Sequence, residues 1–195
     1  MTPGSGAWET ASPPGGTPPA LARNARLLLL GLLALYGIAY MRDPGGGHLI
    51  DGIDLAIHET GHLVFAPFGE VIQFAGGTLF QLIVPLVFLA YFLRFAPRRD
   101  RFAASVMLWW VAVNLWSIAV YMADARTQEL PLVGGGEHDW AYLFGRFGLL
   151  NQDTAIARSV RALGALLFLI ALVRGYLAAT QPAPADVVDD GDGAR

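Results

Sequence analysis

The stretch LIDGIDLAIHETGHLVFAPF, residues 49–68, is largely apolar but contains several ionisable side chains. These side chains are Asp51, Asp54, His58, Glu59 and His62. Ionisable groups in an apolar membrane segment are costly unless they face a protein interior or a water-filled cavity. The stretch therefore predicts a helix that carries a polar site into an otherwise apolar chain.

The rest of the chain predicts a membrane protein. Of its 195 residues, 54% are hydrophobic and 15% are charged, a balance typical of a membrane class rather than a soluble globule. Four apolar runs approach the ~20 residues that cross a bilayer core: Leu27–Met41, Leu79–Phe95, Phe102–Ala123 and Val160–Ala179. We expect an all-α fold, a polytopic membrane helical bundle of four transmembrane helices plus the helix of residues 49–68.

The two ends of the chain differ from its middle in composition. Residues 1–22 are rich in Pro, Gly, Ser and Thr, and residues 181–195 are acidic, so both are expected to be disordered tails around a membrane domain of residues 23–180. Arg23 and Arg26 directly precede the first apolar run without a cleavage pattern behind it, which favours a retained membrane helix over a signal peptide. All 13 basic residues are arginine, a bias that favours a bacterial source and hence an integral, multi-pass protein of the inner (cell) membrane.

Charge also predicts the orientation in the membrane. Four arginines occupy the short connection between the second and third runs: Arg94, Arg98, Arg99 and Arg101. The positive-inside rule places this connection in the cytoplasm, and the connection Asp124–Arg158 on the other side. The side of the N-terminus depends on whether the helix of residues 49–68 spans the bilayer or only dips into it, and the sequence leaves both open.

Composition narrows the partners and the metal ligands. The formal net charge of −3 and the absence of a basic aromatic stripe argue against nucleic acid. With no cysteine, a bound metal must use His, Asp, Glu or water. The expected partners are the lipid bilayer and a membrane-protein or peptide substrate.

Residues 58–62 read HETGH, an instance of H-E-x-x-H. On a helix, positions i and i+4 lie on one face, so His58 and His62 can bind one metal ion. Two imidazoles and one further oxygen or nitrogen suit Zn²⁺, with Glu59 as the general base of hydrolysis. Asp51 and Asp54 either accept a hydrogen bond from a ring nitrogen of a ligand histidine, or belong to the start of the helix as its N-cap and first turn.

Two further segments join HETGH in a resemblance. One is GGTLFQLIVPL from Gly76, and the other is NLWSIAVYMAD, residues 114–124. Together the three segments resemble the short bacterial branch of the site-2 protease (peptidase M50-like) family of intramembrane zinc metalloproteases, over about residues 49–125. The chain departs from the family in carrying M-A-D-A where L-D-G is common, in lacking the proline of the glycine-rich turn, and in having no PDZ-like module.

The resemblance implies a ligand set and roles for several residues. It implies zinc bound by His58, His62 and Asp124, a glycine-rich turn at Gly76 opening the next membrane helix, and substrate positioning or oxyanion binding by Asn114 or Gln81. The alternative third ligand is His138, in the stretch GGGEHDW of residues 134–140, with Glu137 or Asp139 as further alternatives.

Three functions fit these patterns. The leading hypothesis is a membrane-embedded zinc metalloprotease that hydrolyses peptide bonds in or near the membrane. The alternatives are a non-catalytic membrane metal-binding protein, either scaffold or carrier, and a hydrolase acting on lipid or another amide. Glu59 separates the first two hypotheses, because metal storage or transport does not need a glutamate beside the first histidine.

Overall fold

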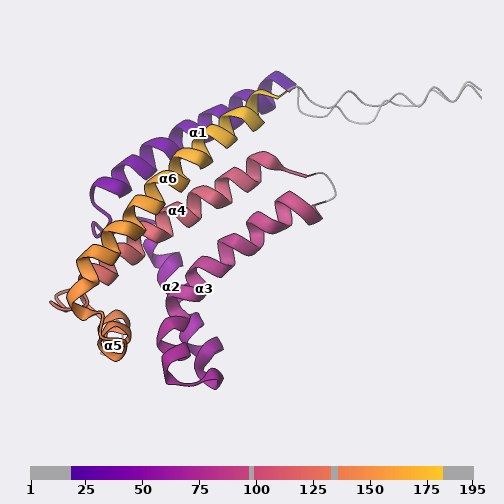
Figure 1. The fold of residues 1–195 in the computed structure, drawn as a ribbon. Coiled ribbons are helices and arrows are strands. Elements are labelled where there is room, and N and C mark those ends of the chain that lie inside the picture. The colour runs from indigo at the N-terminus through magenta and orange to yellow at the C-terminus, as the bar shows by residue number, and fades with distance from the viewer. Residues whose placement is uncertain (1–18, 97–98, 133–135, 182–195) are drawn as a thin grey trace, which may run out of the picture.

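The computed structural model describes residues 19–96, 99–132 and 136–181, and these residues are all-helical, as predicted (Figure 1). The elements in chain order are α1 (Pro19–Arg42), α2 (Asp51–Phe65), η1 (Ala66–Phe68), α3 (Glu70–Ala90), the π turn η2 (Tyr91–Phe95), α4 (Arg101–Ala123), α5 (Asp139–Arg146), η4 (Leu150–Gln152) and α6 (Asp153–Thr180). The helix expected at residues 49–68 is confirmed as α2 and η1.

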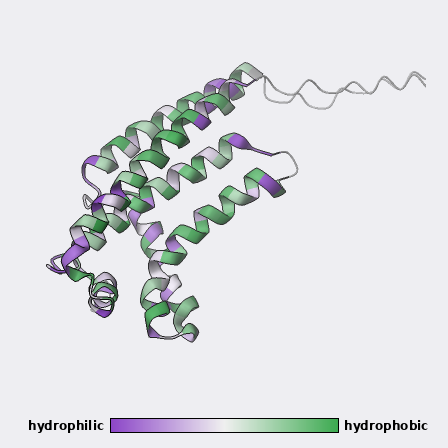
Figure 2. Cartoon of the chain, in the orientation of Figure 1, coloured by the Kyte–Doolittle hydropathy of each residue, from purple (hydrophilic) through white to green (hydrophobic). Residues whose placement is uncertain are grey.

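Four helical segments are long and apolar enough to cross a membrane: Ala20–Arg42, Glu70–Phe95, Arg101–Ala123 and Leu150–Thr180. They contain the four runs predicted from the sequence, and Figure 2 shows apolar residues along each of them. The 15-residue helix α2 is not among them. The chain is therefore a multi-pass membrane protein with a shorter helix set among its spans.

Helix α4 is the centre of the bundle. It packs along α6 and also contacts α1 and α3. Two of its tryptophans, Trp109 and Trp116, are buried. Their indole N–H groups donate to backbone carbonyls of two neighbouring helices, Trp109 to Leu33 on α1 at 2.9 Å and Trp116 to Arg161 on α6 at 3.2 Å. Such bonds are needed because an unpaired indole N–H in an apolar core is costly.

The chain turns back into the bundle between α1 and α2. The His48 ring lies 4.4 Å from the Tyr40 ring, and the Ile50 backbone N–H donates to the Tyr36 hydroxyl at 3.2 Å. Asp51 does not cap α2; its carboxylate accepts from the His48 backbone N–H and the Tyr40 hydroxyl, at 2.6 and 2.8 Å, and so holds this connection. These contacts hold the start of α2 against the last turns of α1.

This arrangement determines on which side the ends of the described chain lie. Four crossings bring the start of α1 and the end of α6 to the same end of the bundle, which is also the end that carries the connection between α3 and α4 (Figure 1). We refer to it as the arginine end, after Arg23, Arg94, Arg99, Arg101 and Arg174. The opposite end holds α5 and the C-terminal half of α2.

Helices α2 and α3 touch through glycines. A Cβ atom on Gly76 would lie 2.8 Å from the Gly61 carbonyl oxygen, and a Cβ on Gly61 would collide with the Gly76 carbonyl. Gly76 and Gly77 lie inside α3, so the glycine-rich turn that the resemblance implied is wrong. No proline stands beside these two glycines, and the helix that begins at Glu70 continues through both of them.

The N-terminal tail predicted at residues 1–22 overlaps the described part of the chain at residues 19–22. Helix α1 begins at Pro19, so residues 19–22 are helical rather than part of the tail, and proline is well tolerated in a first helical turn. Residues 1–18 and 182–195, which make up the remainder of the predicted tails apart from Gln181, lie outside the described residues.

The topology can be tested with single cysteines, because the chain has none of its own. A cysteine at Arg99 should resist an impermeant thiol reagent in intact cells, since the positive-inside rule holds this connection in the cytoplasm. A cysteine at the exposed Glu137, at the opposite end, should react. The measurement is labelling before and after permeabilisation, and the reverse pattern would invert the orientation.

Candidate metal centre

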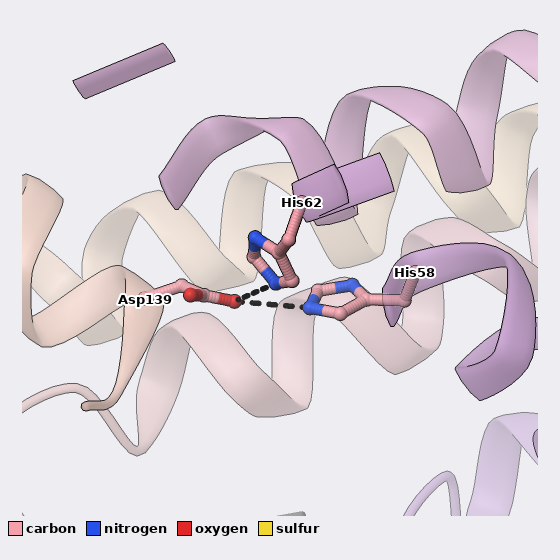
Figure 3. A group of neighbouring side chains, drawn as sticks. All are labelled: His58, His62 and Asp139. Atoms are coloured by element: carbon pink, nitrogen blue, oxygen red, sulfur yellow. Dashed lines mark hydrogen bonds and ion pairs between the residues drawn. The ribbon is translucent and has the colours of Figure 1, made fainter. Parts of the chain in front are cut away.

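Three side chains meet at the end of the bundle opposite the arginine end (Figure 3). His58 and His62 come from consecutive turns of α2, and Asp139 is the first residue of α5. The Asp139 Oδ2 lies 2.9 Å from the His58 Nε2 and 3.3 Å from the His62 Nε2. One ligand atom from each residue lies within 4.8 Å of the others, so this group can hold a metal ion.

Helix α3 orients both imidazole rings. The His62 Nδ1 donates to the Gln73 backbone carbonyl at 2.8 Å, and the His58 Nδ1 donates to the Gln81 Oε1 at 3.3 Å. A carbonyl oxygen only accepts hydrogen bonds, so each Nδ1 carries the proton of its ring. Each Nε2 is then left with its lone pair aimed at the Asp139 carboxylate. Histidines that bind a metal through one ring nitrogen usually donate the proton of the other nitrogen to such an acceptor.

A lone pair and a carboxylate oxygen at this distance repel each other unless a proton or a metal cation lies between them. The bond to Asp139 raises the pKa of His62 to about 9, although burial opposes the rise. Burial alone would raise the pKa of Asp139, but its hydrogen bonds with His58 and His62 outweigh burial and lower it. Positive charge is therefore favoured at this point, and a bound metal would displace a proton to supply it.

Gln81 and Asn114, which the resemblance made substrate-positioning residues, lie behind His58. The Gln81 Nε2 donates to the Asn114 Oδ1 at 2.7 Å, and the two side chains are 5% and 0% exposed. Neither lines the cavity beside the metal group. The structure thus places Gln81 and Asn114 as buried supports of the His58 ring.

Asp124, the third ligand implied by the resemblance, lies apart from the two histidines. Its Oδ1 accepts from the Thr127 hydroxyl at 2.6 Å and the Glu129 N–H at 2.9 Å, and its Oδ2 accepts from the Leu130 N–H at 3.1 Å. Burial would raise the pKa of Asp124, but these bonds lower it. Both oxygens are held by the connection that follows α4, and Asp139 takes the place beside the histidines.

His138, the alternative third ligand, also points away from the group. Its ring is 2% exposed and is the N-cap of α5, where the Nδ1 accepts from the Ala141 N–H at 3.2 Å. Its Nε2 lies 3.3 Å from the Asp124 Oδ2, and its ring packs on Tyr121 at 4.1 Å. His138 and Asp124 therefore anchor α5 to the end of α4, which sets the position of the next residue, Asp139.

A cavity of about 370 Å³ opens beside the metal group. Its lining includes Glu59, Glu137 and Tyr121, and Glu59 is exposed to it while His58 is largely buried. The Tyr121 hydroxyl accepts the Asp139 backbone N–H at 3.2 Å, so its own proton remains available to a molecule in the cavity. Sequence reasoning missed Tyr121; its position one helical turn before Asp124 was the available signal.

The packing of His58 on α3 generates a prediction about Gly77. A Cβ atom there would lie 2.5 Å from the His58 Nε2 and 2.6 Å from its Cε1, so Gly77→Ala must displace the ring. We expect Gly77→Ala to lower the metal affinity roughly 10- to 100-fold, the loss typical when a residue that orients a metal-binding histidine is removed. Gly52→Ala on α2 is the control, because a Cβ there has no neighbour within 4 Å. Titration with a competing chelator measures the metal affinity of both variants. Equal affinities in Gly77→Ala and Gly52→Ala would contradict the packing of His58 on Gly77.

Comparison with known proteins identifies no relative: no protein-family model, no curated protein and no solved structure matches the chain.

Proposed function

We propose that this chain is a membrane-embedded zinc metalloprotease, similar to the site-2 proteases, that hydrolyses peptide bonds in or near the membrane. One observation carries the proposal. The Nδ1 atoms of His58 and His62 are both engaged by α3, so both Nε2 atoms face one carboxylate beside a cavity that Glu59 lines.

The donor set fits zinc. Two neutral imidazole nitrogens and one carboxylate oxygen are a ligand set of catalytic zinc sites, which leave a fourth position to water or substrate. We take Asp139 as the third ligand in place of Asp124. A zinc ion bound there would polarise a substrate carbonyl and lower the pKa of water to ~7.

Glu59 and Tyr121 are the residues suited to proton transfer and charge stabilisation. Glu59 follows His58 directly and lies on the cavity, so its carboxylate can accept a proton from the attacking water and return it to the leaving amine. The Tyr121 hydroxyl, which points its free proton away from the Asp139 N–H, can donate to the oxygen of the scissile carbonyl. A metal store or carrier needs neither group.

The position of the cavity suits a substrate held by the membrane. Residues on α2, η1 and α3 near the site expose apolar side chains, with Leu63 77% and Phe68 67% exposed. Lipid would cover such side chains, while Glu59, Glu70 and Glu137 give the cavity a polar wall that admits water. A peptide segment at the membrane surface can therefore meet both water and the site.

Metal analysis of purified variants tests the ligand set. The wild type should hold about one zinc per chain, and His58→Ala, His62→Ala and Asp139→Asn should each lose it, because too few ligands remain. His48→Ala, which removes a histidine outside the group, is the matched control and should keep the metal. Retention of zinc in all three ligand variants would refute the site.

Asp124→Asn separates the two candidate third ligands. Asn keeps the size of the Asp124 side chain and one oxygen acceptor for the N–H groups of its loop, so this variant should leave α5 in place and retain zinc while Asp139→Asn loses it. Zinc content by elemental mass spectrometry measures both. The opposite result would make Asp124 the ligand, as the resemblance implied.

Glu59→Gln tests catalysis apart from metal binding. Zinc should remain, since Glu59 is not a ligand, and turnover should fall ~100-fold or more with loss of the general base. The measurement compares new N-termini among membrane proteins of cells that express the wild type or the variant. Identical sets of N-termini would favour a scaffold or carrier function.

A further inference from the structure

A second hollow lies at the arginine end, remote from the metal group. It has a volume of about 500 Å³ and is bounded by the end of α3 with η2, the start of α4 and the end of α6. It shares no lining residue with the cavity beside the metal group. The proposed protease chemistry therefore makes no use of it.

The lining of this groove has a cationic part. Arg99, Arg101 and Arg174 line it, and all three are exposed. In the part of the chain that the structure describes, none of them forms an ion pair with an acidic side chain. The neighbouring Asp100 does not line the groove; its carboxylate accepts from the Phe102 and Ala103 N–H groups at the start of α4. Within the described residues, the three guanidinium groups are thus without an acidic partner.

The remaining lining is largely apolar. It includes Leu89, Leu93, Leu108, Ile170 and Leu177, all of which belong to spans that cross the membrane. Some of these side chains are exposed on the surface of the protein, Leu93 by 39% and Leu177 by 49%. The groove therefore continues from the guanidinium groups along the lipid-facing surface of three helices.

We propose that this groove binds an anionic phospholipid of the cytoplasmic leaflet. Guanidinium groups hold phosphate through paired N–H bonds, and basic pockets between transmembrane helices on the cytoplasmic side take acidic head groups. The positive-inside rule places the arginines on the cytoplasmic side of the membrane, the side of these head groups. The apolar side chains below the arginines then contact an acyl chain of the lipid. A free phosphate could not make these apolar contacts.

The test uses the full chain in mixed detergent micelles with phosphatidylglycerol or phosphatidylcholine, and counts bound lipids by native mass spectrometry. The wild type should bind phosphatidylglycerol in preference to phosphatidylcholine. The variant R99Q/R101Q/R174Q should lose affinity for phosphatidylglycerol on the order of 100-fold, and Arg174→Gln alone about fivefold, with phosphatidylcholine binding unchanged.

Arg158→Gln is the matched control, an exposed arginine at the other end of α6 whose Nε donates to the Thr154 carbonyl of its own helix. It should keep the wild-type lipid preference. Unchanged phosphatidylglycerol affinity in the triple variant, equal loss of both lipids, or equal loss in Arg158→Gln would overturn the proposal. Displacement of phosphatidylglycerol by the same concentration of glycerol phosphate would also overturn it, because the groove would then be a simple anion site.

Discussion

The contact between the glycine backbones of α2 and α3 is the constraint on which the metal group depends. Gly61 and Gly76 have no space for a Cβ atom, so the two helices approach until their backbones touch. At this separation the His58 ring packs against Gly77, and the His62 ring reaches a backbone carbonyl of α3. Small residues permit such close approach between helices in membranes. The distance between two helices therefore sets the orientation of both ligand rings.

Several polar side chains inside the bundle form hydrogen bonds between helices rather than within one helix. A continuous set of hydrogen bonds runs from Asp139 on α5 through His58 and Gln81 to Asn114 on α4. One turn before His58 on α2, the carboxylate of Asp54 accepts from the Trp110 indole at 2.8 Å. Unpaired polar groups in an apolar medium cost several kcal/mol each. The bonds that offset this cost also tie α2, α3, α4 and α5 into one arrangement, so the metal group is held by rigid elements.

The two ends of the bundle carry different chemistry. At one end, Arg99, Arg101 and Arg174 line an apolar groove between α3, α4 and α6. Carboxylates and histidines gather at the other, where the Asp124–His138 pair fastens α5 and presents Asp139 to α2. One end suits the anionic surface of a membrane, and the other suits a metal cation and water. This polarity follows from which helix ends the four crossings bring together.

The sequence by itself determined the membrane helices and two of the three members of the metal group. Run length and the i, i+4 spacing of His58 and His62 are local properties, so they can be predicted without knowing what packs where. The third member depends on a connection some eighty residues further along the chain. Only the tertiary structure decided it, because the Asp124 carboxylate is occupied by nearby N–H groups and His138 caps α5, which leaves Asp139 facing the histidines.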